Sequence, residues 1–438
     1  MSNALRSFEA QWRARQADAL QPIREQAMQR FLKLGLPTQR DETWRYTDLR
    51  GLAAQSFETA ACDARADVAR GALEPGALSL VDADQHATTL VMVNGCLPEK
   101  FADTEINGIE ISSISDLSKQ DSRTWARFFP VASDADQRRW VLLNTALFDD
   151  GLYLKITRQI DAPLVILHVS TGQRENEAAH PRIIIDAMPG SRATIIEHHV
   201  AHDGLAPLNN STTHIALARD AQLEHYRVYS TGAGATHLDS LDIHQARGSH
   251  CRQFTIALGG GLVRSSLEAH LNEPEASLES FSLLVGHADR HVDCVNIVTH
   301  AAPDTRSRQT ARAIAGDVSR VIFNSKVIVE AGAVNSNSQQ SCKGLLLSPR
   351  AEIDTRPQLE IHADEVKCAH GATTGRLDPD MLFYLLSRGL DRETAQSLLV
   401  YAFLADVLTG MSVSSARSAI ENALISQLPD SQILRKFR

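Results

Sequence analysis

The sequence predicts a mainly β protein, with a right-handed parallel β-helix core between helical regions at both ends. From Gly151 to about Val366, short runs rich in Val, Ile, Leu and Thr alternate with polar residues and show no helical period. Turn-like units such as PGSRATI (from Pro189) and GDVSRVIF (from Gly316) precede these runs, at spacings near about 28 residues early and about 14 to 18 late. A solenoid needs such a period and a sandwich does not. We therefore favour two short strands per coil, with a jelly roll or other sandwich as the alternative.

The first 36 residues predict two helices, because apolar residues recur there at roughly helical spacing. Pro22 is expected to separate the helices, and Gly35 with Pro37 ends the second. The following segment, RDETWRY around Trp44, is an aromatic and charged patch. We expect it to pack onto the next domain rather than to bind a ligand.

The region from about residue 53 to 137 is mixed. The run TLVMVN (89–94) is a buried-strand candidate that ends at the turn signal Asn94-Gly95. The stretch 125–148 is expected to be helical.

The chain after Gly375 turns helical again. Asp378 is a plausible N-cap, and Gly389 is placed to end the first helix, MLFYLLSR. Asp391 is expected to cap a second helix, and a third opens near Ser414. The first helix is apolar on nearly every side, so one face should pack on the β-helix. The rest of it either meets a partner protein or is buried between neighbouring helices.

Three domains follow from these patterns. Residues 1–140 form an N-terminal helical and mixed domain, 141–377 the parallel β-helix, and 378–438 a C-terminal helical domain.

Composition and charge exclude several classes of function. The chain has 438 residues, with 43% apolar and 22% charged residues and a net charge of −9. No basic block is present, which argues against nucleic-acid binding. No run of about 18 apolar residues occurs, so no segment is expected to span a membrane. The start has no signal-peptide core, and a cytoplasmic location is expected.

Motifs of common enzymes are also missing. The sequence has no GxxxxGK[ST], GxSxG or HExxH, so the chain is not expected to hydrolyse ATP itself. The triplet Gly259 to Gly261 is interpreted as a tight β-helix turn instead of a phosphate loop.

The cysteines stand singly, without a CxxC pair, so neither a zinc knuckle nor a self-contained cluster site is encoded. We expect all six to be reduced thiols, most of them buried. The six are Cys62, Cys96, Cys251, Cys294, Cys342 and Cys368.

Cys368 and His370 form the main candidate site. Two positions apart in a strand, their side chains share one face. Thiolate and imidazole are suitable iron ligands, but two are too few to hold a cluster tightly. That fits a transient site completed by another chain. The alternative is a buried structural cysteine beside a capping histidine.

The other histidines are expected on the surface or stacked between coils. His198 and His199 are adjacent in a strand and point to opposite faces, so they cannot easily share an ion. His287 and His291 flank a turn, and His362 can share a face with Glu360.

Long segments of the chain resemble the SufB/SufD family of scaffolds in the SUF iron–sulfur cluster assembly machinery. They include GGGLVRSSLEAHL (from Gly259), HVDCVNIVTH (from His291) and RPQLEIHADEVKCAHGATTGRLD (from Arg356), the last followed by LFYLLSRG. The element Lys-Cys-Ala-His-Gly is similar to the SufD branch, because SufB carries a Glu-His-Glu-Ala type element there. The clustered N-terminal cysteine motif of SufB is absent. A SufB-like paralogue acting as the primary cluster scaffold is the alternative.

The resemblance implies a non-catalytic scaffold whose β-helix end pairs with a SufB-like scaffold. It implies a transient Fe–S cluster at that junction, with Cys368 and His370 as iron ligands, and no cofactor bound tightly to the chain alone. A SufC-like ABC ATPase, which carries the ATP, would dock on the C-terminal helices. Alone, the chain could form a homodimer. The candidate docking residues are Leu382, Phe383, Leu386, Arg388, Leu398 and Phe403.

A carbohydrate-active β-helix enzyme is the alternative from another class of function. Such enzymes are usually secreted and display aromatic platforms, whereas this chain has no signal peptide and only 5% aromatic residues.

Overall fold

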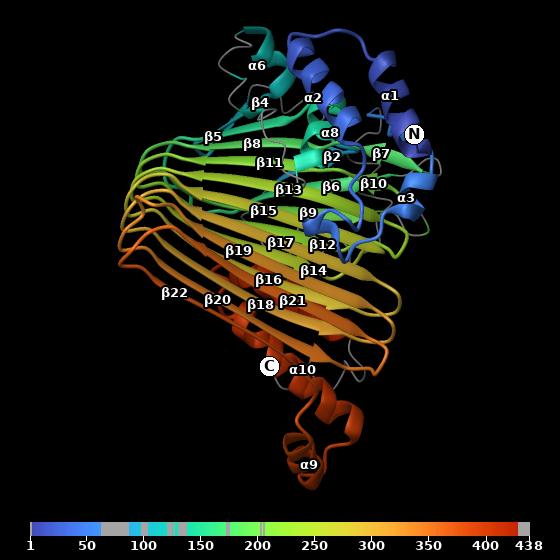
Figure 1. Ribbon diagram of the computed structural model, residues 1–438, viewed down its shortest axis with the longest axis vertical. Coiled ribbons are helices and arrows are strands. Elements are labelled where there is room, and N and C mark those ends of the chain that lie inside the picture. The colour runs from blue at the N-terminus through green and yellow to red at the C-terminus, as the bar shows by residue number, and fades with distance from the viewer. Residues whose placement is uncertain are drawn as a thin grey trace.

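The computed structural model shows a parallel β-solenoid between two groups of helices (Figure 1). The structure describes residues 2–62, 87–97, 104–120, 125, 128–129, 138–171, 176–201, 204 and 206–427. Successive strands of the chain alternate between two sheets, so each coil contributes one strand to each sheet. The predicted fold class is confirmed.

One sheet runs in the order β2-β6-β9-β12-β14-β16-β18-β20-β22, and all its described pairings are parallel. We call it sheet B. Its strands are β2 (Thr88–Val93), β6 (Leu164–Ser170), β9 (Arg192–Ala201), β12 (Gln222–Tyr229), β14 (His250–Ala257), β16 (Ser277–Gly286), β18 (Arg306–Ala315), β20 (Asn337–Leu346) and β22 (Lys367–Gly375).

The second sheet, sheet A, runs in the order β21-β19-β17-β15-β13-β11-β8-β5-β4-β3. It is parallel except at its start, where β3 pairs with β4 and β4 with β5 in antiparallel fashion. Its strands are β3 (Thr104–Ile106), β4 (Ile109–Ser113), β5 (Leu152–Ile156), β8 (Arg182–Ala187), β11 (Thr212–Leu217), β13 (Thr236–Gln245), β15 (Leu262–Leu271), β17 (His291–His300), β19 (Arg320–Val329) and β21 (Glu352–Ile361). Short strands β1 (Glu58–Thr59), β7 (Glu177–Ala179) and β10 (Leu208–Asn209) pair beside it.

The core of the solenoid lies between the two sheets. Because side chains alternate along a strand, every second residue points inward. Ile185, Ile215 and Ile243 stack in register on successive coils of sheet A, and all three are fully buried in one apolar cluster. Burial of such columns between coils is the main stabilising term of a solenoid.

Tight turns join the strands at the coil corners. Asp220 and Asp317 have positive φ angles of 58° and 51°, which aspartate tolerates better than most residues. Gly260 has a φ of +92°, and a Cβ atom at Gly261 would collide with the carbonyl oxygen of Ala233. The glycine triplet is therefore a tight turn, as expected.

Helices α1 (Asn3–Ala14), α2 (Gln21–Leu34), α3 (Arg50–Ala54), α6 (Ile114–Gln120) and α8 (Arg139–Leu147) gather at the N-terminal end of the solenoid. Pro22 lies in the first turn of α2 and Gly35 caps its end, as predicted. The helix expected over 125–148 is present as α8, and most of the preceding residues lie outside the described ones.

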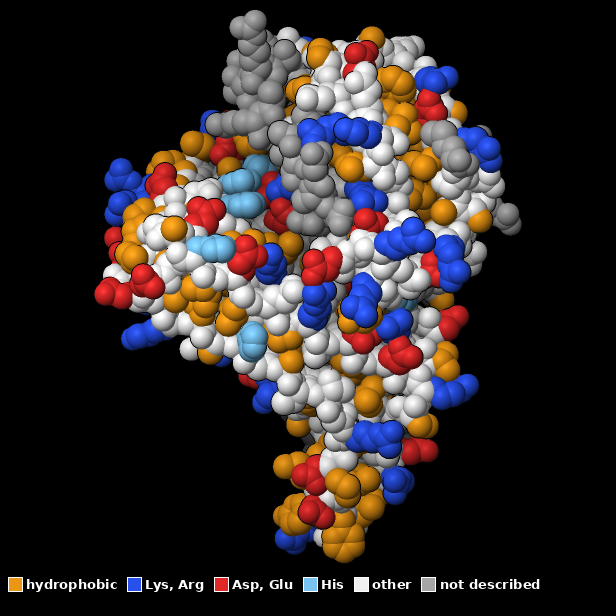
Figure 2. Space-filling view, viewed as in Figure 1, with side chains coloured by type: hydrophobic (Ala, Val, Ile, Leu, Met, Phe, Trp, Pro, Cys, Tyr) orange, Lys and Arg blue, Asp and Glu red, His pale blue; other side chains and the backbone are white. Residues whose placement is uncertain are grey.

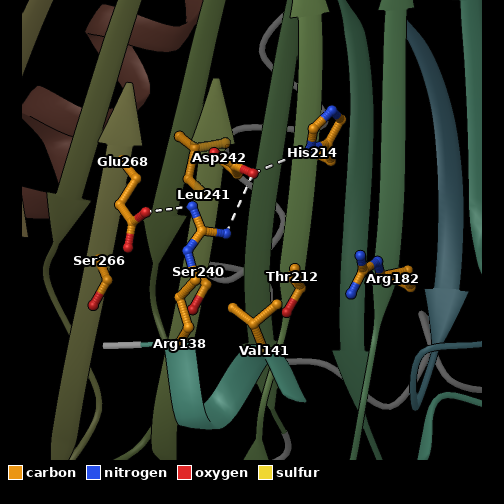
Figure 3. Close-up of a pocket in the computed structure, with 10 residues that line it drawn as sticks. All are labelled: Arg138, Val141, Arg182, Thr212, His214, Ser240, Leu241, Asp242, Ser266 and Glu268. Atoms are coloured by element: carbon orange, nitrogen blue, oxygen red, sulfur yellow. Dashed lines mark hydrogen bonds and ion pairs between the residues drawn. The ribbon is translucent and has the colours of Figure 1, made fainter. Parts of the chain in front are cut away.

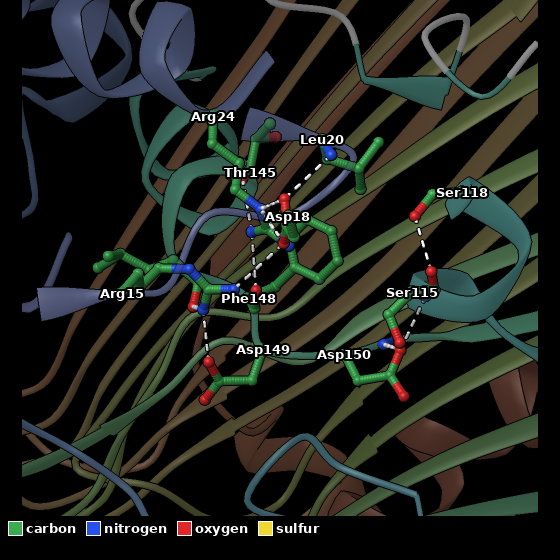
Figure 4. Close-up of polar contacts among 12 residues, drawn as sticks. Arg15, Asp18, Leu20, Arg24, Ser115, Ser118, Thr145, Phe148, Asp149 and Asp150 are labelled. Carbon is green, nitrogen blue, oxygen red and sulfur yellow. Dashed lines mark hydrogen bonds and ion pairs between the residues drawn. The ribbon is translucent and has the colours of Figure 1, made fainter. Parts of the chain in front are cut away.

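A buried arginine ties α2 to α8. The Arg24 side chain is 1% exposed. It donates to both carboxylate oxygens of Asp18 (3.1 and 2.9 Å) and to the Phe148 carbonyl (2.8 Å). Its guanidinium carbon lies 4.0 Å from the centre of the Phe148 ring. Figure 4 shows this contact set, with Arg15 reaching Asp149 beside it.

The RDETWRY segment is a packing element, as predicted. It contains the 3₁₀-helix η1 (Glu42–Trp44), and Trp44 is buried. The guanidinium of Arg264, from β15, lies 3.7 Å from the centre of the Trp44 ring. Arg264 also donates to the Thr43 carbonyl (2.8 Å) and pairs with Asp293 of β17.

Helices α9 (Pro379–Ser387), α10 (Arg392–Leu408) and α11 (Ser414–Ser426) follow the solenoid. The Asp378 and Asp391 side chains cap α9 and α10, as predicted. Val400, Leu404 and Val407 of α10 pack against the outer face of sheet B, whereas α9 extends beyond it (Figure 1). The alternative that α9 is buried between neighbouring helices is wrong. Met381, Phe383 and Tyr384 are 59%, 72% and 56% exposed.

The prediction of six free thiols is wrong for one pair. Cys62 and Cys96 form a disulfide, with their Cα atoms 5.6 Å apart. The reason is the turn after β2, where the Asn94 amide donates to the carbonyl of Ala61 (2.7 Å) and brings the two cysteines together. The other four cysteines are free, and Cys251, Cys294 and Cys342 are buried as expected.

None of the described helices combines the length and the apolar character needed to cross a membrane.

Candidate functional site

Cys368 and His370 lie on β22, the last strand of sheet B. They are in register with Ser338 and Gln340 of β20. Ser338 and Gln340 are buried, whereas Gln339 between them is exposed. The side chains of Ser338 and Gln340 therefore face the interior of the solenoid. The two candidate ligands therefore share the inward face, as the two-residue spacing predicts.

The two side chains differ in exposure. Cys368 is half-buried and packs at the edge of the apolar core with Leu359 and Val366, and His370 is exposed. Partial burial raises the pKa of the Cys368 thiol, against a hydrogen bond with the Ser338 backbone that lowers it. The thiol is therefore protonated at neutral pH, and a nearby cation would favour the thiolate.

The end of the solenoid beside this pair is open. β21 and β22 are the last strands of the two sheets, and no described strand pairs with their outer edges. Most residues of β22 are exposed. Unpaired strand edges are places where another chain can add to a sheet.

A polar column leads inward from His370 through sheet B. In register order from β20 to β12, it consists of Gln340, Gln309, Ser280, Gln253 and His225. All five are buried. The solenoid interior therefore has a polar band between two apolar clusters.

Glu197 is the charged centre of this interior. It is fully buried and accepts hydrogen bonds from His168 (3.2 Å), His225 (2.8 Å) and Thr213 (2.9 Å). Burial alone would raise the pKa of Glu197, but Arg227 and the two histidines hold it well below the usual value. With its oxygens engaged by these groups, Glu197 is a structural anion and not a free ligand.

The histidines singled out from the sequence are stacking residues. His199 stacks on His168 with ring centres 4.3 Å apart. His198 points to the opposite face of sheet B, where it is in register with Leu167 and Val228 of the neighbouring strands. Both are buried, so stacking is confirmed and surface placement is wrong for this pair. At the surface, His362 contacts Glu360 at 3.1 Å. His287 precedes the turn before β17, and His291 contacts Thr47 at 2.9 Å.

A second cluster, which sequence reasoning missed, lies on the outer face of sheet A (Figures 2 and 3). We call it the outer histidine cluster. Its members come from three successive coils, and they are His214, Asp242, His244, Glu268 and His270. Burial would raise the pKa of Asp242, but the close approach of the His214 imidazole and a hydrogen bond with His244 hold it far below its usual value. Burial also lowers the pKa of His214. The carboxylate is therefore ionised and the imidazole neutral at neutral pH.

The six docking candidates do not share one environment. Phe383 and Arg388 are exposed, and the Arg388 guanidinium lies 5.0 Å from the centre of the Tyr384 ring. Leu382 is buried, and Phe403 packs against the cluster on sheet B. Leu386 and Leu398 are half-buried. Of the six, the accessible side chains are therefore mainly those of α9 and the turn after it.

Comparison with known proteins covers nearly the whole chain. Residues 168–403 match the family model described as SUF system FeS cluster assembly, SufBD core domain. Residues 4–166 match the SufBD protein N-terminal region. The chain is 28% identical to the iron-sulfur cluster assembly protein SufD of Escherichia coli, over 98% of this chain and 97% of that protein. It is 21% identical to the protein of the same name from Bacillus subtilis, over 79% of this chain and 80% of that protein. The chloroplastic protein ABCI7 of Arabidopsis thaliana is 25% identical over 89% of this chain and 82% of that protein.

Proposed function

This chain belongs to the SufBD family of the SUF iron–sulfur cluster assembly system, and from that membership we propose that it is a SufD-type scaffold subunit of a SufBCD-type complex. It has no catalytic role of its own in this proposal. Its task is to present part of a cluster site and to connect a second scaffold with an ATPase.

The observation that carries the proposal is the inward-facing pair Cys368 and His370 at the open end of the solenoid. One thiolate and one imidazole are a partial ligand set for iron. A SufB-like scaffold that covers this end would supply the remaining ligands and shield the cluster from water. Because the cluster is cargo that must leave, a half-site on each partner suits its release.

The partner at this end would dock against the unpaired edges of β21 and β22. A protein that adds a strand to each edge would satisfy backbone groups that now face solvent. The same edges would support a homodimer when the chain is alone.

The ATPase would dock on the C-terminal helical domain, for which we propose the limits 378–438. The exposed apolar side chains Met381, Phe383 and Tyr384 support this placement, because contiguous exposed apolar surface marks sites of protein interaction. ATP would bind to the SufC-like partner, and its binding would shift the population of the scaffold interface between closed and open states.

Co-expression with a SufB-like and a SufC-like partner tests the proposal. We compare wild type with Cys368→Ala and His370→Ala, and use Lys367→Ala, a neighbour on the same strand whose side chain faces outward, as the matched control. Each complex is purified without oxygen, and its visible absorption and bound iron are measured. Equal complex formation with cluster loss only in the first two variants supports the proposal. A full cluster in both of them would place the site on the partner and overturn the proposed role of the pair.

A further inference from the structure

We propose that the outer histidine cluster is a binding site for a divalent transition-metal ion, with His214, Asp242 and His244 as ligands. The site is independent of the Cys368 and His370 pair, because it lies on the outer face of sheet A and not at the open end. Neither Cys368 nor His370 belongs to the outer histidine cluster.

Parallel stacking explains how three coils build the cluster. His214 is in register with Asp242, and Asp242 with Glu268. His244 is in register with His270, one column further along the strands. Neighbouring strands lie about 4.8 Å apart, and side chains two positions apart share a face. These two neighbouring sets of in-register residues, on three adjacent strands, therefore bring imidazoles and carboxylates within reach of one another.

The distances fit ligands around one ion. His214 Nδ1 and His244 Nε2 each lie 3.3 Å from Asp242 Oδ2. In a tetrahedral zinc site with bonds of about 2.0–2.1 Å, neighbouring ligand atoms lie about 3.3–3.4 Å apart. The two imidazoles thus stand at ligand spacing from the same carboxylate oxygen.

Unsatisfied polar atoms point the same way. His214 is 6% exposed, and its Nδ1 atom makes no well-aligned hydrogen bond within the described part of the chain. The same holds for Asp242 Oδ1. A buried polar atom without a partner destabilises the folded chain. An ion between Nδ1 of His214 and the Asp242 carboxylate would remove much of that destabilisation.

The surroundings hold the carboxylate in place. His270 stacks on His244 with ring centres 4.7 Å apart, and its Nε2 lies 3.7 Å from Asp242 Oδ1. Arg138 pairs with Glu268 and approaches Asp242 Oδ2 at 3.6 Å. Two arginines and two carboxylates line the pocket, so their charges balance before an ion enters. The lining is Arg138, Val141, Arg182, Thr212, His214, Ser240, Leu241, Asp242, Ser266 and Glu268 (Figure 3).

The donor set selects the kind of ion. Two imidazoles and one carboxylate suit Zn²⁺ or Fe²⁺, whereas Ca²⁺ and Mg²⁺ prefer oxygen ligands. The adjoining pocket of about 20 Å³ is lined by His214 and Asp242 but not by His244, and it has room for about one water molecule that could complete the coordination of an ion at the cluster. Three protein ligands leave a coordination position for water or for the neighbouring His270. The Glu197 group of the interior differs, since His168, His225 and Thr213 engage both of its carboxylate oxygens, whereas Asp242 Oδ1 has no hydrogen-bond partner in the described part of the chain.

Titration of the full-length, untagged protein with Co²⁺ alone tests the site. Four-coordinate Co²⁺ gives strong visible d–d absorption, so the spectrum reports both stoichiometry and geometry. Zn²⁺ and Fe²⁺ are then measured in separate competition arms. We expect one equivalent of Co²⁺ in wild type, displaced by Zn²⁺ and, only at an excess, by Fe²⁺, and a higher Tm with the metal than with a chelator.

Two ligand variants and one control make the outcome decisive. Asp242→Asn preserves shape, and His244→Gln changes a side chain that is 39% exposed. Both should fold, as circular dichroism can verify, and weaken Co²⁺ binding at least about tenfold. His250→Gln, at a partly exposed histidine of β14 on the other sheet, should bind as wild type does. Absence of d–d absorption in wild type, or equal binding by all four proteins, would overturn the proposal.

Discussion

Cys368 of β22 is in register with Ser338 of β20, so the inward-facing row of side chains that contains Ser338 ends on a thiol at the last strand of sheet B. The other three free cysteines lie deeper, and burial raises the pKa values of Cys251, Cys294 and Cys342 to about 12. The thiolate, and not the thiol, is the nucleophile that attacks an alkylating reagent. We therefore expect Cys368 to be the only free cysteine that reacts quickly in the folded chain. Alkylation followed by peptide mass spectrometry measures this.

The matched variants for this prediction are Cys368→Ser and Cys342→Ser. The first should remove the fast phase of labelling, and the second should leave it unchanged. Fast labelling at Cys342 in the native protein would show that the interior is open to solvent and that the described packing is wrong.

Arg264 and Asp293 form a buried ion pair behind Trp44, with both side chains 1% exposed. Removal of one partner leaves an uncompensated buried charge, which costs about 3–5 kcal/mol. We expect Arg264→Met and Asp293→Asn each to destabilise the protein by about 3 kcal/mol in urea unfolding. The double variant should lose less than the sum of the two. Strict additivity would contradict direct coupling of the pair.

His198 is buried on the outer face of sheet B, and neither ring nitrogen has a described hydrogen-bond partner. Burial lowers its pKa to about 3, with a smaller contribution from His168. The unfolded chain, with a histidine pKa of about 6.5, takes up this proton first. Stability from the neutral ring is therefore complete above pH 6.5 and is lost as the pH falls toward 3.

His198→Leu should accordingly stabilise the protein by about 1–2 kcal/mol at neutral pH and reduce the loss of stability in acid. Unfolding free energies at pH 7.5 and pH 5 measure both effects. The surface variant His362→Leu serves as the control, and we expect it to change neither quantity by more than about 0.5 kcal/mol. A parallel pH dependence of His198→Leu and wild type would rule out this role of His198.

The turn at Gly259 to Gly261 can be tested by adding a single methyl group. Gly261→Ala would push a Cβ atom into the Ala233 carbonyl oxygen, whereas Gly332→Ala meets nothing within 4 Å. Displacement of a tight turn costs about 1–3 kcal/mol. We expect thermal unfolding to show this loss for Gly261→Ala and little change for Gly332→Ala. Equal stability of the two variants would mean that the coil relaxes at no cost.

The sequence could predict the solenoid because its period is local: each coil repeats turn, strand, turn and strand. The caps Asp378 and Asp391 were predictable for the same reason, since the residue type and its position are both visible in the chain. The outer histidine cluster was harder, although a signal existed. HIA from His214, DIH from Asp242 and EAH from Glu268 recur at coil spacing. Recognising it requires the register of stacked strands, which depends on the number of residues in every intervening turn. The Cys62 to Cys96 disulfide depends on a contact between distant segments and left no sequence pattern.

Phe383 is the most exposed of the large apolar side chains in the described structure, at 72%. A substitution there removes apolar surface without disturbing the core. We expect Phe383→Asp to leave the Tm of the isolated chain unchanged and to weaken binding of the SufC-like ATPase by at least about tenfold, because one anchoring aromatic contributes about 2 kcal/mol or more at such an interface. Calorimetric titration with the purified ATPase measures this. Val318→Asp is the matched control, an exposed apolar residue at a coil corner between β18 and β19, and it should bind as wild type does. Undiminished binding by Phe383→Asp would move the docking surface away from α9.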